Sequence, residues 1–82
     1  MTQRNEPSVA ASYANFVVVG HNAFEVVLEF GQVYEGNDEP HMHTRLVTTP
    51  AYAKAMLETL RTSLARFEAA HGPIPDTMEQ EL

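Results

Sequence analysis

The hydrophobic pattern of the chain changes its period at Thr49-Pro50. Before this point apolar residues alternate with polar ones, as in "AFEVVLEFGQVY", and a period of two is typical of a β-strand with one buried face. Beyond it, apolar residues recur every three or four positions and lay one stripe along an α-helix: Ala53, Leu57, Leu60, Leu64 and Phe67. Thr49 suits the N-cap and Pro50 the first helical position. The sequence therefore predicts strands followed by one helix.

Three extended segments precede the predicted helix. The first, "YANFVVVG", is rich in β-branched and aromatic residues, and the link "GHNA" contains Gly20 and Asn22, which tolerate the positive φ of a tight hairpin. The turn formers of "EGNDEP" then separate the alternating segment from a third one, "HMHTRLVTT". We therefore predict an α+β fold, a three-stranded antiparallel β-meander followed by one long C-terminal helix packed on one sheet face (β-β-β-α).

The ends of the chain differ in composition from its centre. "HGP" at residues 71–73 is expected to end the helix with a glycine C-cap. A helix of about 22 residues is roughly 33 Å long, which is enough to cover strands of 8 to 10 residues from end to end. We expect a disordered N-terminal tail at residues 1–11, a single domain at 12–72 and a flexible acidic tail at 73–82.

Length and composition narrow the function classes. A chain of 82 residues supports one small domain that buries only about 60% of its unfolded surface. It has no cysteine, which excludes disulfides and thiol chemistry and leaves oligomerisation as the means of stabilisation. The net charge of -6 argues against nucleic-acid binding. Without a long apolar run or a signal-like N-terminus, we expect a cytoplasmic protein with no membrane insertion.

One helix can cover only one face of the predicted sheet. We expect seven side chains to point at the helix: Phe16, Val18, Phe24, Val26, Leu28, Phe30 and Leu46. The opposite face then carries a valine stripe with a charged rim: Val17, Val19, Val27 and Val47, bordered by Glu25, Glu29, Arg45 and His43. Exposed apolar patches mark interfaces, so we predict a homo-oligomer, most simply a two-fold dimer, formed through this face.

Two alternatives to that interface remain open. The valines could instead satisfy strand propensity on a solvated face. The unpaired edges of the first and third strands could also add a strand from another chain, or hold an extended client peptide.

The histidines offer the clearest candidate for chemistry. His41 and His43 are two apart on a predicted strand, so both project to one face, as two imidazole ligands of a divalent ion would. A third ligand could come from His21, Asp38 or Glu39. The alternative is a solvent-facing strand start beside an acidic loop.

The carboxylates give no catalytic pair. Glu25 and Glu29 lie four apart on one predicted strand, hence about 13 Å apart, which is too far to act on one glycosidic bond. Arg45 is expected to be their salt-bridge partner. The serines form no activated nucleophile with a base, and we predict no catalytic residues and no cofactor.

Taken together, these segments resemble the small bacterial and archaeal family of the domain of unknown function 3467. The resemblance covers about residues 13–75 and rests on these features: Asn15, Phe30-Gly31-Gln32, Arg45, Pro50 with Ala53-Lys54, Leu57, Leu60 and Gly72. One departure is Phe67, where the family is expected to favour tyrosine before Glu68. The resemblance implies a fold and no activity. A fold-level analogy links the chain to the export chaperone SecB, which also joins a β-meander to a long helix and assembles through its sheets.

These observations favour a non-enzymatic, oligomeric module that binds another protein as an adaptor, a chaperone-like factor or an accessory subunit. The alternative is a metal-binding protein that uses the His41/His43 pair.

Overall fold

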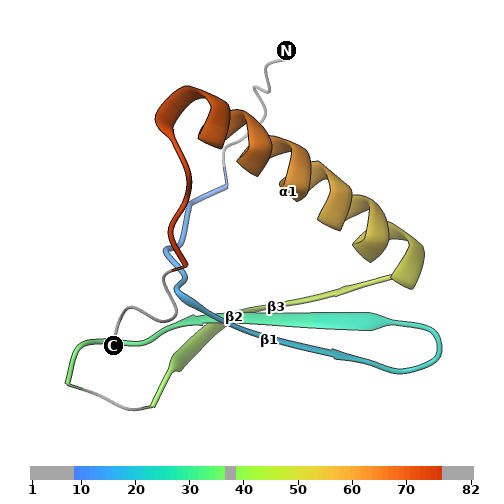
Figure 1. Cartoon of the computed structure of the whole chain (residues 1–82). Coiled ribbons are helices and arrows are strands. Elements are labelled where there is room, and N and C mark those ends of the chain that lie inside the picture. The colour runs from blue at the N-terminus through green and yellow to red at the C-terminus, as the bar shows by residue number, and fades with distance from the viewer. Residues whose placement is uncertain (1–8, 37–38, 77–82) are drawn as a thin grey trace. The chain divides into compact units, whose positions relative to one another are not determined.

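The computed structural model describes residues 9–36 and 39–76. In chain order the elements are β1 (Phe16–His21), β2 (Val26–Gln32), β3 (His41–Thr48) and α1 (Pro50–His71) (Figure 1). The strands form one open antiparallel sheet in the order β1-β2-β3, so the predicted α+β meander followed by a C-terminal helix is confirmed. The chain divides into a sheet unit that ends at Val47 and a helix unit that begins at Thr48. Packing of the helix on the sheet stays a prediction.

The predicted tails are described only in part. Residues 1–8 and 77–82 lie outside the described residues, as does Asp38, which the sequence offered as a metal ligand. Residues 9–14 and 72–76 are described and contain no helix or strand.

The side chain of Asn22 shapes the hairpin between β1 and β2. Its Oδ1 accepts hydrogen bonds from the backbone N–H groups of Phe24 at 2.7 Å and Glu25 at 2.8 Å, and its own N–H donates to the Glu25 carbonyl at 3.0 Å. The prediction of a hairpin is confirmed, but its reason is wrong. Among the described residues only Gly36 and Gly72 have positive φ, so Asn22 acts by mimicking a backbone acceptor.

A β-bulge marks the other end of the β1–β2 ladder. Phe16 lies opposite Gly31, and the N–H of Asn15 also donates to the Gly31 carbonyl at 3.0 Å, so two residues of one strand oppose one of the other. Beyond the bulge the Asn15 amide takes the place of a peptide group. Its Oδ1 accepts from Val33 N–H at 2.7 Å and its Nδ2 donates to Val33 O at 3.2 Å.

The register of β1 on β2 decides which side chains share a face, because residues opposite one another in an antiparallel pair project to the same side. Val17 lies opposite Phe30 and Val19 opposite Leu28. This defines the Phe30 face of the hairpin: Val17, Val19, Val26, Leu28 and Phe30. The other side is the Glu29 face: Phe16, Val18, Val27 and Glu29.

The predicted division of the hairpin into two faces is therefore wrong for β1. Phe16 and Val18 do not share a face with Leu28 and Phe30, and Val17 and Val19 do not share one with Val27. All residues of the run "FVVV" are apolar, so its pattern does not indicate which of them lie on which face of the sheet, that is, the phase of the strand. The phase is set instead by the lengths of the Asn22 turn and the bulge.

The helix begins and ends where the sequence predicts. Thr49 Oγ1 accepts from Tyr52 N–H at 3.0 Å, and Pro50 occupies the first turn. At the other end Gly72 has φ 96° and donates its N–H to Glu68 O at 2.9 Å, and this positive φ favours glycine. The Glu68 carboxylate also accepts from Ile74 N–H at 2.8 Å, which fixes the direction in which the chain leaves the helix.

Little apolar surface is buried within the described part of the chain. Leu28, at 9% exposure, is its only buried large hydrophobic side chain. On β1, Val17 is 50% and Val19 59% exposed, and the helix stripe is about half exposed at Leu57, Leu60, Leu64 and Phe67. Neither unit therefore encloses a hydrophobic core of its own.

Candidate functional site

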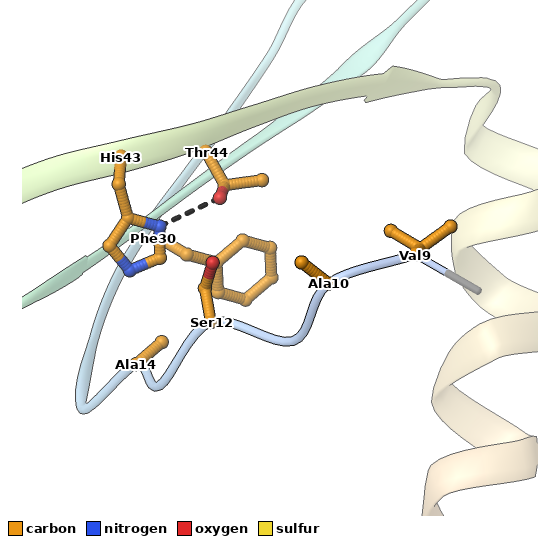
Figure 2. A pocket seen from close by; sticks show the side chains of 7 residues that line it. All are labelled: Val9, Ala10, Ser12, Ala14, Phe30, His43 and Thr44. Atoms are coloured by element: carbon orange, nitrogen blue, oxygen red, sulfur yellow. Dashed lines mark hydrogen bonds between the residues drawn. The ribbon is translucent and has the colours of Figure 1, made fainter.

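A hollow of about 530 Å³ lies on the sheet unit where the segment before β1 passes β2 and β3 (Figure 2). Residues from three parts of the unit line it: Val9, Ala10, Ser12, Ala14, Phe30, His43 and Thr44. Most of these side chains are small or apolar. His43 is the only titratable group among the lining residues. Its contacts therefore decide whether the hollow offers a side chain for binding or catalysis.

Both ring nitrogens of His43 are engaged. Nε2 lies 3.0 Å from the carbonyl oxygen of Tyr13, and Nδ1 lies 2.7 Å from Thr44 Oγ1 (Figure 2). A carbonyl oxygen can only accept, so Nε2 carries the proton; in the neutral ring Nδ1 then accepts from the Thr44 hydroxyl. His43 thus ties the segment before β1 to β3, which is a structural role.

The predicted metal ligands are not brought together. His21 ends β1, His41 begins β3, and His43 is committed to Thr44 and Tyr13. Within residues 9–36 and 39–76 no three His, Cys, Asp or Glu side chains are grouped so that they could hold an ion. Metal binding through His43 would require it to give up at least one hydrogen bond. The His41/His43 metal site stays a prediction, with no geometric support.

The expected ion pair between Arg45 and Glu29 is confirmed, with Arg45 Nε 3.4 Å from Glu29 Oε2. The two side chains are 69% and 38% exposed, and exposed pairs of this kind contribute at most about 1 kcal/mol. Glu25 was expected on the same strand, and this is wrong. It lies in the hairpin loop ahead of β2, because Asn22 extends the turn to include it.

Sequence reasoning assigned no role to two residues that shape the sheet, Asn15 and Gly31. A Cβ at Gly31 would lie 2.6 Å from the carbonyl oxygen of His41 and 2.6 Å from Met42 Sδ, so β3 can approach β2 there only because Gly31 has no side chain. Asn15 preceding a β-branched run was the one available signal for its backbone-mimicking amide.

With this geometry established, comparison with known proteins adds one finding. A family model described as "Protein of unknown function (DUF3467)" matches residues 2–76. The chain belongs to this family. Several of the features that carry the resemblance have structural roles here: Asn15, Gly31, Pro50 and Gly72. No curated protein and no solved structure matches the chain.

The described part of the chain contains no helix with the length and apolar content needed to span a bilayer. The helix also carries charged residues outside its apolar stripe, among them Lys54, Glu58 and Arg61.

Proposed function

We propose that this member of the DUF3467 family is a small, non-enzymatic cytoplasmic module that self-associates through its sheet and binds another protein, as an adaptor, a chaperone-like factor or an accessory subunit. The observation that carries the proposal is the exposure of apolar side chains on both faces of the β1–β2 hairpin. Val17 and Val19 on the Phe30 face and Val18 on the Glu29 face are each about half exposed.

A single helix leaves part of this surface uncovered. α1 has 22 residues and is therefore about 33 Å long and about 10 Å across, enough for one face of a three-stranded sheet whose strands are about 4.8 Å apart. Both faces carry apolar side chains, so a helix docked on one of them would leave the other available to a second molecule. Exposed apolar surface of this kind marks protein interfaces.

The polar side chains of the sheet unit that were candidates for chemistry have structural partners. Glu29 is paired with Arg45, and His43 is held by Thr44 and Tyr13. These contacts hold the surface of the sheet unit in a fixed arrangement, which supports a binding role.

The test is the mass of the purified protein by light scattering and sedimentation over micromolar concentrations. An oligomer is expected. The Val27→Glu variant, which places a charge on the Glu29 face, should weaken the oligomer if that face forms the contact, while the helical circular dichroism stays unchanged; a contact along a sheet edge should survive the substitution. Thr62→Glu on the helix is the matched control. A compact monomer at every concentration would contradict self-association.

Protein binding is tested separately. The wild-type chain and Val27→Glu are used to capture partners from the native cell, and the captured proteins are compared by mass spectrometry. Protein binding through the sheet predicts a partner retained by the wild type and by Thr62→Glu and lost by Val27→Glu. Identical capture by all three variants would remove the sheet surface from the proposal.

A further inference from the structure

In the part of the chain that the structure describes, the outer edge of β1 carries backbone groups that have no partner strand. In an antiparallel pair, hydrogen-bonded and non-hydrogen-bonded residue pairs alternate. The bond from Asn22 N–H to Glu25 O identifies that pair as hydrogen-bonded, so the register directs the N–H and C=O groups of alternate residues to β2: Phe16, Val18 and Gly20. Those of Val17, Val19 and His21 point the other way. Because β1 is at the end of the sheet, they point away from it.

This edge also lacks the features that normally prevent strand addition. Exposed edges are protected by charged side chains, prolines or bulges that turn the strand away. β1 contains no Lys, Arg, Asp, Glu or Pro, and all six of its residues are exposed. Its bulge lies at Asn15, before the strand begins. β3, the strand at the opposite edge, has Arg45 near its middle.

We propose that β1 pairs with β1 of a second copy of this chain, antiparallel and across a two-fold axis at Val19. This rests on the proposed self-association and specifies its geometry. With the axis at Val19, each Val19 exchanges two hydrogen bonds with the other, and Val17 does so with the partner's His21 on both sides of the axis, about six bonds in all. An axis at Val18 would allow only about four, because the Asn15 N–H is already bonded to Gly31.

A second copy fits this edge because two β1 strands can pair without bringing like charges together. A two-fold contact brings the same strand face to face, and β1 contains no formal charge to repel its copy. The same operation on β3, with its axis at Arg45, would bring the two Arg45 side chains opposite one another, and like charges in that position destabilise a sheet. The result is a six-stranded sheet in which the valines of the Phe30 face run on from one copy to the other.

Charge substitution at the axis tests the pairing directly. Val19→Lys and Val19→Glu each place two like charges opposite one another, and each variant is expected to have half the wild-type mass if the wild type is a dimer. Mixed in equal amounts, the two variants place Lys opposite Glu and should recover the full mass. His41→Lys, on exposed β3, is the control and should keep the wild-type mass.

The outcomes separate this inference from the function on which it rests. A wild-type oligomer whose mass is unchanged in both Val19 variants overturns β1 pairing and leaves self-association standing. Failure of the mixture to recover the mass overturns the axis at Val19. A monomeric wild type overturns both β1 pairing and self-association. This holds even if the edge of β1 binds an added peptide.

A cysteine reporter gives a second measurement that does not depend on a charged variant folding. The natural chain has no cysteine. Hydrogen-bonded partners have Cα atoms about 5.5 Å apart, within the range of a disulfide, so oxidised Val19→Cys should form a covalent dimer. Val18→Cys is the matched control, because its two copies would be about 8 Å apart. Equal cross-linking of the two variants, or none in Val19→Cys, refutes the pairing.

Discussion

Replacing Gly31 by alanine tests the close approach of β2 and β3. The new methyl group would lie 2.6 Å from the His41 carbonyl oxygen and 2.6 Å from Met42 Sδ. The thioether is the end of a flexible side chain and can move. The carbonyl belongs to the backbone of β3, so relieving that contact requires the strand itself to shift.

The size of the effect follows from two opposing contributions. Overpacking of this kind costs about 1 to 3 kcal/mol, and the loss of a glycine from the unfolded chain returns about 0.4 to 1 kcal/mol. We expect Gly31→Ala to lower the free energy of unfolding by about 1 to 2 kcal/mol.

Gly20→Ala is the matched control, since it makes the same chemical change on the same sheet. Gly20 has no positive φ, and a Cβ added there would meet nothing within 4 Å, so its variant should be as stable as the wild type or up to about 1 kcal/mol more stable. The two variants should then differ by about 2 kcal/mol, or roughly 8 to 16 °C in Tm. Urea unfolding followed by circular dichroism, at one protein concentration because association shifts the midpoint, measures the difference. Equal stability of the two variants would refute the close approach at Gly31.

Three further substitutions test single interactions. Asn15→Ala removes both hydrogen bonds between the Asn15 amide and Val33; it should cost about 1 to 2 kcal/mol and speed hydrogen exchange at Val33, and unchanged exchange would argue against the amide acting as a peptide mimic. Thr49→Ala removes the N-cap of α1 and should cost about 1 kcal/mol with a loss of helical circular dichroism, whereas Thr49→Ser should keep both. Arg45→Gln should change stability by less than about 1 kcal/mol and should remove any salt dependence due to the exposed pair; a larger loss would mean that Arg45 has a buried partner.

The sequence predicted the structure well at positions where a residue type has one common role in local backbone geometry. Thr49, Pro50 and Gly72 predicted both ends of the helix, because caps are determined by neighbouring backbone groups. The alternation in β2 predicted that strand's two faces correctly. The apolar run of β1 contains no alternation, so its phase depends on the Asn22 turn and the Asn15 bulge, and both are side-chain hydrogen bonds that a hydropathy pattern does not register.

The candidate site was harder to predict for a related reason. The histidine pair suggested a metal site because residues two apart on a regular strand share a face. The hydrogen bonding of His43, however, depends on the segment before β1. This segment brings the Tyr13 carbonyl to Nε2 from thirty residues away in sequence. Contacts between distant segments of this kind have no short-range signal. The same holds for Gly31, because it is the close approach of β3 that leaves no room for a side chain at this position.

The described residues hold the two edge strands of this sheet differently, and the proposed assembly follows from this difference. β3 is tied to the N-terminal segment through His43 and carries Arg45 in an ion pair. Among residues 9–36 and 39–76, the contacts that hold β1 lie on its inner side: the Asn22 turn, the Asn15 amide and the ladder with β2. Its outward N–H and C=O groups lie beside half-exposed valines, so a single added strand would satisfy the hydrogen bonds and cover apolar surface at once. Because Leu28 is the only large hydrophobic side chain buried in the described chain, the proposed contact between copies would also supply part of the core that the monomer lacks.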